Sequence, residues 1–287
     1  MSSIVNPLDA PSVINQETRS SNSMISLIKS EFYKLGKTKA FYLLMAICAA
    51  LAIAIAFALK SGAAMAAANP GNADLQDMAK FQDSFGGAWF VGYSLGNGLQ
   101  AVIIAIFVSI FIAVEFNYGP MKNIISRGFN RTQEYLAKLI TSVVASMCLL
   151  AVYMLAGLLT GTALWGFDPH GVASVGSLLT LFLTQTLLII SYTSIFVFVA
   201  MSLRNNGASI GANISIVLMG TFVVQAVSLL FHTKINLMNY WISECITQLA
   251  TLNPVSADVT RGIIVAVGYT LLATVLGSIL FNKQDIK

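Results

Sequence analysis

The sequence predicts an all-α integral membrane protein with six transmembrane helices. Hydrophobic residues make up 56% of the chain and charged residues only 10%, whereas soluble domains usually carry about 25% charged residues. The charged residues also leave six long intervals free, as expected where a charged side chain at a helix centre costs roughly 2.5 to 3.5 kcal/mol. Most of this chain is therefore expected to lie in lipid.

The six charge-free intervals set the expected spans. About twenty helical residues cross the roughly 30 Å hydrocarbon layer, so each interval is expected to hold one helix. All six prolines lie outside the intervals, which favours uninterrupted helices. The intervals are Phe41 to Leu59, Ser84 to Val114, Leu139 to Phe167, Gly171 to Leu203, Asn205 to Phe231 and Gly262 to Asn282.

The distribution of basic residues predicts the orientation. If both termini and the second and fourth connections share one side, that side holds twelve of the sixteen Lys and Arg residues. Because Lys and Arg are enriched in cytosolic loops, both termini are expected in the cytosol. The four basic residues left for the outer side are Lys60, Lys80, Lys234 and Arg261.

The segment before the first span divides into two parts. Residues 1–23 are polar and rich in Ser and Asn, which predicts a disordered cytosolic tail. Residues 24–40 predict an amphipathic interfacial helix, and residues 41–287 a six-span membrane domain. The alternative for residues 24–40 is a solvated leader with accidental periodicity. The apolar stripe of the predicted helix consists of Ile25, Ile28, Phe32 and Leu35, opposite a face with Lys29, Ser30, Lys34 and Lys37.

A second amphipathic segment, Met121 to Lys138, follows the second span. It predicts a short cytosolic helix, with Glu134 and Lys138 as a favourable i,i+4 pair. A basic surface stripe against anionic lipid is the alternative. Its apolar face would carry Ile125, Phe129 and Leu136, and its polar face Arg127, Arg131, Glu134 and Lys138.

The sequence predicts no catalytic, cofactor or metal site. Gly36-Lys37-Thr38 looks like the end of a phosphate loop, but Glu31 stands where the first glycine of that loop belongs. His170 and His232 lack a spaced ligand partner, and the three cysteines share no short spacing. The formal charge of +4 is diffuse, so no nucleic-acid partner is expected.

Ionisable residues are missing from the middle of the expected spans. Ion-coupled carriers usually place such residues, or broken helices, near the bilayer midplane. Glu115 lies at the cytosolic end of the second span, and the amides of Gln100, Gln185, Asn213 and Gln225 are uncharged. Free energy for transport is therefore expected from a partner. A secondary carrier, or a non-transport membrane protein such as an intramembrane hydrolase, is the alternative.

Three segments together resemble the permease subunits of bacterial type-2 ATP-binding-cassette (ABC) transporters. They are LIKSEFYKLGKTKAFYLL, EFNYGPMKNIISRGFNRTQEYLAKLI and FNKQDIK. The family order is an elbow helix, a Glu ending span two, a basic loop, six spans and a basic tail. The long polar N-terminal segment and Gln284 depart from the family pattern.

The resemblance implies an assembly of two six-helix permeases, identical or paralogous, with two copies of a soluble ATPase that bind ATP and Mg in the cytosol. It also implies a bacterial plasma membrane, a mostly exporting activity and a coupling helix between spans two and three. Apolar spans with scattered amides favour an amphipathic or hydrophobic substrate such as a peptide, antibiotic or lipid; ordinary helix packing, which gives the same composition, is the alternative. The ATPase-coupling residues would be Glu115, Lys122, Ile125, Arg127, Phe129 and Arg131; an outer re-entrant helix before span six would carry Leu237, Trp241 and Leu252.

The first testable prediction concerns orientation. Single cysteines at Asn72 and Asn130, in a background without the native cysteines, should react differently with an impermeant reagent added outside. We expect labelling at position 72 and none at position 130, because the second loop carries the cytosolic excess of basic residues. The reverse pattern would contradict the orientation.

Overall fold

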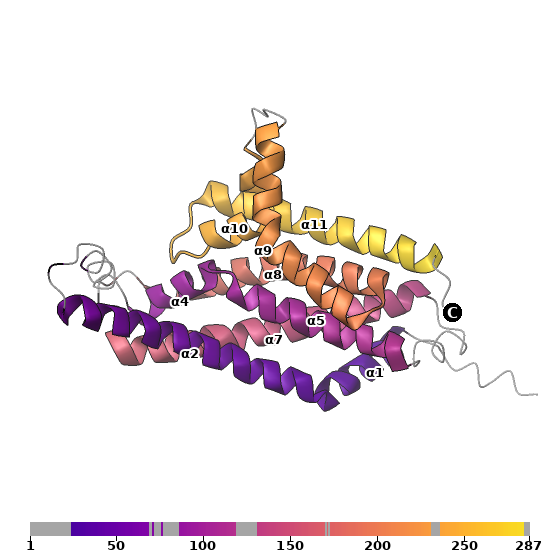
Figure 1. Ribbon diagram of the computed structural model, residues 1–287, viewed down its shortest axis with the longest axis horizontal. Helices are drawn as coiled ribbons and strands as arrows, with labels where there is room; N and C mark the ends of the chain where they lie inside the picture. Colours follow the sequence, from indigo (N-terminus) through magenta and orange to yellow (C-terminus); the bar gives the residue numbers. More distant parts are fainter. Residues whose placement is uncertain are drawn as a thin grey trace, which may run out of the picture.

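The fold is a bundle of long helices (Figure 1). The computed structural model describes residues 24–68, 71, 76, 86–118, 131–169, 171, 173–230 and 236–283, and within these ranges it contains no strand. Six of the described helices are long and apolar enough to cross a membrane, which confirms the predicted all-α architecture and span count. The helices are α1 (Met24–Lys37), α2 (Lys39–Ala68), α4 (Gly87–Gly96), α5 (Leu99–Tyr118), α7 (Arg131–Trp165), α8 (Val175–Leu203), α9 (Asn206–Leu230), η2 (Leu237–Tyr240), α10 (Ile242–Gln248) and α11 (Ser256–Lys283).

The long helices lie roughly along one axis, with α1 at one end (Figure 1). We call this the α1 end; it also holds the end of α5, the start of α7 and the end of α11. The opposite end, which holds α4 and α10, is called the α10 end. Helices α2 and α4 pack on α7, α11 packs on α8, and α5 packs on α8 and α9. Figure 1 shows the last part of α9 standing away from the other helices, and α9 is the least buried of the six spans.

The second span is broken, so the prediction of one uninterrupted helix from Ser84 to Val114 is wrong. The interval contains α4 and α5, separated at Asn97 and Gly98. Gly98 has φ +66°, a left-handed conformation that glycine adopts without steric cost. The side-chain amide of Gln100 donates to the Leu95 carbonyl at 3.0 Å and so holds the two helix ends together. Hydropathy does not record such a break, because both halves are apolar.

Glycines allow the backbones of α4 and α7 to lie in direct contact. A Cβ atom on Gly87 would lie 2.6 Å from the Thr162 nitrogen, and one on Gly161 would lie 3.0 Å from the Gly87 Cα. The Tyr153 hydroxyl adds a hydrogen bond to the Ser94 carbonyl at 3.1 Å. Small residues commonly permit such close packing between membrane helices. The α4 segment is therefore fixed to α7 although it is only ten residues long.

Two predicted boundaries need correction at the α1 end. Helix α7 begins at Arg131, not at Leu139, so residues 131–138 belong to a long span; residues 119–130 lie outside the described part of the chain. Helix α1 matches the predicted amphipathic helix, but it buries Leu27, Glu31 and Leu35, while Ile25 is exposed. The predicted apolar stripe differs from the buried face of α1, because hydrophobicity does not identify a buried glutamate.

The contact between α4 and α7 gives a stability prediction. Gly87→Ala should lower the free energy of unfolding by about 1–3 kcal/mol, because the added methyl group meets backbone that cannot rotate away. Gly268→Ala is the matched control, since nothing lies within 4 Å of a Cβ atom at this helical position. Thermal unfolding of the purified variants in detergent would measure both. Equal midpoints for the two variants would contradict the close packing.

Candidate functional site

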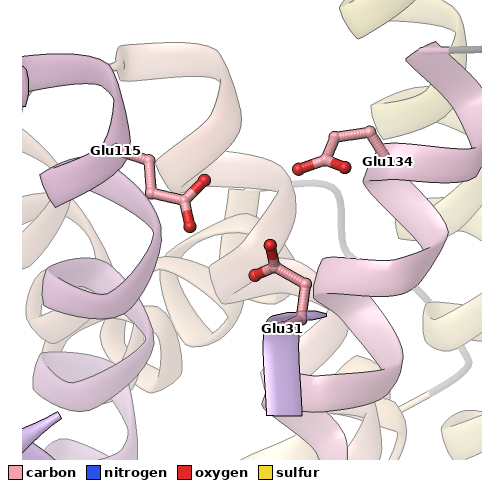
Figure 2. A group of neighbouring side chains, drawn as sticks. All are labelled: Glu31, Glu115 and Glu134. Carbon is pink, nitrogen blue, oxygen red and sulfur yellow. The ribbon is translucent and has the colours of Figure 1, made fainter. Parts of the chain in front are cut away.

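Five charged side chains gather at the α1 end, where three helices meet. Glu31 and Lys34 come from α1, Glu115 from the last turns of α5, and Glu134 and Lys138 from the first turns of α7. Figure 2 shows the three carboxylates pointing toward one another. The side chains of all but Lys34 are at most 8% exposed, whereas the Lys34 side chain is 32% exposed. We call these five residues the ionic cluster.

Lys138 is the hub of the ionic cluster. Its ammonium donates to Glu115 Oε2 at 2.5 Å and to Glu31 Oε2 at 3.1 Å, and it lies 3.5 Å from Glu134 Oε1. One fully buried cation thus contacts carboxylates on α1, α5 and α7. The three helices are joined through a single nitrogen atom.

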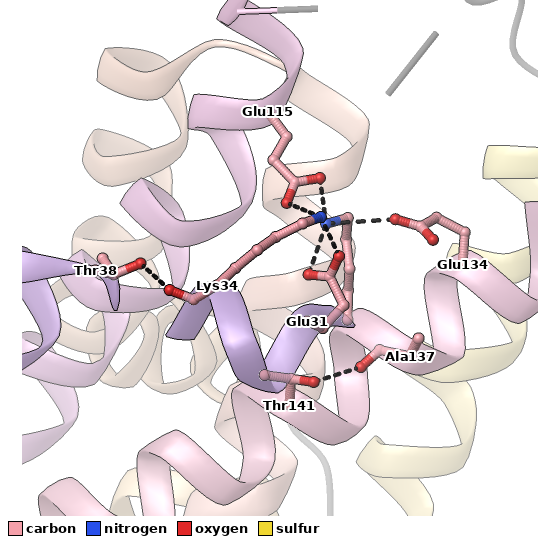
Figure 3. Close-up of polar contacts among 8 residues, drawn as sticks. Glu31, Lys34, Thr38, Glu115, Glu134, Ala137 and Thr141 are labelled. Atoms are coloured by element: carbon pink, nitrogen blue, oxygen red, sulfur yellow. Dashed lines mark hydrogen bonds and ion pairs between the residues drawn. The ribbon is translucent and has the colours of Figure 1, made fainter. Parts of the chain in front are cut away.

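Lys34 repeats part of this arrangement from α1. Its ammonium donates to Glu31 Oε1 at 2.5 Å and to Glu115 Oε1 at 3.0 Å, so Glu31 and Glu115 each contact two ammonium groups (Figure 3). Thr38 donates to the Lys34 carbonyl at 2.8 Å and holds the last turn of α1. The glutamate pair therefore binds α1 to α5 through both lysines.

Each charged side chain of the ionic cluster depends on its partners for charge compensation. Among the described residues, three carboxylates face two ammonium groups, and the buried Glu134 oxygens make no hydrogen bond. A buried charge costs several kcal/mol unless it is paired, and removing one partner of a buried pair is strongly destabilising. Separation of α1 from α5 and α7 would break these pairs. The ionic cluster thus favours the three helices remaining together.

The three carboxylates have the spacing of a metal site. One oxygen from each of Glu31, Glu115 and Glu134 lies within 4.8 Å of the others. The ammonium of Lys138 contacts the same carboxylates and supplies the positive charge that a metal ion would otherwise bring. We therefore describe this site as an ion-pair site rather than a metal centre.

The start of α7 is also held by the end of α11. Arg131 donates to the Asn282 carbonyl at 3.2 Å, and the Asn282 amide donates to the Thr132 hydroxyl at 2.8 Å. The Tyr135 hydroxyl donates to the Ala273 carbonyl at 3.3 Å, next to Gly277, where a Cβ atom would clash with the tyrosine ring. The first turns of α7 therefore contact α1, α5 and α11.

The structure places two of the six predicted coupling residues. Glu115 lies in the ionic cluster and Arg131 on the α11 contact, at the two sides of residues 119–130. The predictions for Lys122, Ile125, Arg127 and Phe129 lie outside the described residues. The functional roles of all six stay predictions.

Sequence reasoning missed the burial of the ionic cluster. It placed Glu134 and Lys138 on a polar face, and the structure corrects this: the pair exists at 3.5 Å, but both side chains are buried. It noted Glu31 only as a departure from a phosphate loop. The spacing of the leucines could have indicated that Glu31 is buried. Glu31 lies four residues from both Leu27 and Leu35, on the same helix face.

At the α10 end, the segment predicted to form one outer re-entrant helix contains two short helices instead. Leu237 lies in η2, Trp241 separates η2 from α10, and Leu252 follows α10, so the three predicted residues do not share one helix. Gln185 donates to the Ile246 carbonyl at 2.9 Å, and Tyr192 pairs with Ser243 at 2.5 Å. Helix α10 is thereby attached to α8.

The six described helices that are long and apolar enough to cross a membrane fit a multi-pass membrane protein. A profile of the family described as ABC-2 family transporter protein matches residues 27–220, more than half of the chain. The chain therefore belongs to the ABC-2 transporter family, as the resemblance predicted. Members of this family are membrane subunits that associate with an ABC ATPase and often dimerise. A comparison with curated proteins returns no match.

The ionic cluster predicts unequal roles for its two lysines. Lys138→Met should destabilise the protein by about 3–5 kcal/mol, because it leaves buried carboxylates without their hub. Lys34→Met should cost less, since Lys34 is partly solvated and Lys138 remains with its three carboxylate partners. Thermal unfolding of both variants in detergent measures the difference. An equal or larger loss for Lys34→Met would contradict the assignment of Lys138 as the hub.

Proposed function

We propose that this chain is the membrane-spanning permease subunit of an ABC transporter that exports an amphipathic or hydrophobic substrate. Family membership supports the permease role. The ionic cluster gives the strongest support for energy coupling, because it joins α1 to α5 and α7, the two helices that flank residues 119–130. Those residues hold most of the predicted ATPase contact.

The proposed coupling runs through the ends of two helices. The apolar side chains of Ile125 and Phe129 dock in a groove of the ATPase, and Arg127 and Arg131 align the two proteins electrostatically. Displacement of this loop moves the last turn of α5 and the first turn of α7. Because Lys138 contacts carboxylates on both helices and on α1, the same displacement carries α1 with it.

The remaining parts of the proposal concern orientation and partners. Twelve basic residues against four support placing the α1 end in the cytosol of a bacterial cell. Two copies of a soluble ATPase bind ATP and Mg there, and a second permease copy or a paralogue completes the membrane part. Lipid and this second permease cover the exposed apolar surface of α9, which includes Leu218, Phe222 and Val223.

A secondary carrier is the second candidate because the second span is broken. Discontinuous helices often form ion sites in such carriers. The described residues around this break include Gly96, Asn97, Leu99 and Thr247, none of them ionisable. The charged side chains of α5 and α7 lie instead at the other end of the bundle, in the ionic cluster and at Arg131. This distribution favours energy input from an ATPase.

The proposal predicts a specific loss of coupling. Phe129→Ala should abolish copurification of the ATPase or substrate-stimulated transport while membrane insertion is unchanged, because truncating a buried aromatic anchor often costs about 2 kcal/mol or more. Arg131→Ala should act more mildly, mainly by slowing association and increasing salt sensitivity. Affinity purification from membranes at two salt concentrations measures both effects.

Two results would refute this proposal. One is full complex formation and transport by the Phe129→Ala variant, which would favour the lipid-stripe interpretation of the loop. The other is transport by the purified chain in liposomes, driven by an ion gradient without nucleotide. The second result would identify a secondary carrier.

A further inference from the structure

We propose that an uncharged amphiphile binds at the break between α4 and α5, in two adjoining cavities at the α10 end. The inference rests on the proposed transport function and names the class of substrate that this site would take. Both cavities are lined by Gly96, Asn97 and Thr247. The break in the second span is therefore also the place where the two cavities meet.

The first cavity, called the α4 cavity, has a volume of about 250 Å³ and lies between α4 and the chain after α10. Trp89 and Tyr93 stack in its wall, with ring centroids 5.9 Å apart and planes inclined by 14°. The opposite chain approaches closely, because a Cβ atom on Gly92 would lie 2.6 Å from the Ala250 carbonyl oxygen. Aromatic faces and glycine backbone offer a flat apolar surface to a ligand.

The second cavity, called the α9 cavity, has a volume of about 190 Å³ and lies between α5, α9 and α10. Apolar Val217 and Leu218 line it together with the hydroxyl-bearing residues Tyr192, Thr221 and Ser243. The Thr247 hydroxyl donates to the Gly96 carbonyl at 3.1 Å, and this bond lies where the two cavities adjoin. A ligand that occupies both cavities would contact this bond.

The lining determines the charge of the ligand. None of the described residues that line either cavity carries a formal charge. Arg261 lies nearby in the fold, but it pairs with Asp258 at 2.5 Å and contacts Gln248. A charged group would enter without a partner and lose its hydration, whereas a hydroxyl or amide group could bond to Asn97, Thr247 or Thr251.

The volumes limit how much of a ligand enters. Each cavity is smaller than the roughly 300–1,000 Å³ typical of sites for drug-sized molecules. We therefore assign the α4 cavity to an apolar arm and the polar rim at Asn97 to an uncharged hydrogen-bonding group. A lipid-facing surface without a defined site would contact the same apolar arm but would not saturate.

Helix α5 connects this site to the ionic cluster. It begins at Leu99, next to the break, and carries Glu115 near its other end. Twenty helical residues extend about 30 Å, so displacement of Glu115 would reach the wall of the α9 cavity, which Leu99, Ala101 and Val102 line, through one continuous helix. Gly98 provides the point at which α5 can turn relative to α4.

Photolabelling tests the proposed site without requiring the ATPase. The probe is 3-azioctanol, a neutral alcohol with a photoreactive alkyl chain, added to the full chain in phosphatidylcholine nanodiscs. Mass spectrometry should find saturable labelling at Trp89, Tyr93 or Thr251, and unlabelled 1-octanol should reduce it. Octyltrimethylammonium at the same concentration should leave it unchanged, because the described residues that line the cavities offer no charged partner.

Filling the site provides the matched control. Thr251→Trp should abolish the saturable labelling, whereas Ser215→Trp on the exposed surface of α9 should leave it intact. Non-saturable labelling equal to that at Phe222 and Val223 would show contact with membrane lipid only and overturn the inference. Equal competition by the cationic amphiphile would also overturn it. Neither result would affect ATPase copurification, so failure here differs from failure of the proposed transport function.

Discussion

The burial of one lysine among carboxylates from three helices is the constraint on which the α1 end depends. Lys138 has no exposed side-chain surface, and its two shortest contacts reach α1 and α5. An uncompensated ammonium in this position would be too costly to keep. The contacts of α1 with the bundle, the end of α5 and the start of α7 are therefore parts of one arrangement.

The α10 end is built in a different way. Small residues bring α4 close to α7 and to the chain around Ala250, and neutral side chains such as Gln185 and Thr247 bond to backbone carbonyls. Such contacts can be exchanged with less free energy than buried ion pairs. One end held by buried ion pairs and another held mainly by neutral contacts, joined by α5, suit the proposed transfer of force from the α1 end to the proposed ligand site at the α10 end.

The sequence was sufficient for the features that hydrophobicity controls. Charge-free intervals predicted six spans, and the motifs around Glu31 and Glu115 predicted the family. It was insufficient where polar groups are buried or the backbone turns inside an apolar stretch. The sequence pattern places Lys138 on a polar face because two of its three partners, Glu31 and Glu115, lie on other helices. It does not reveal the break at Gly98, because a glycine in an apolar run leaves hydropathy unchanged.

We expect the ionic cluster to couple α1 to α7 energetically. A double-mutant cycle with Glu31→Gln, Lys138→Met and the double variant, measured by thermal unfolding of the purified chain, tests it most directly. We expect the second substitution to cost less once the first is present, with a coupling free energy of about 1–3 kcal/mol. Additive losses, within about 0.5 kcal/mol, would show that the two side chains act independently and would contradict the account.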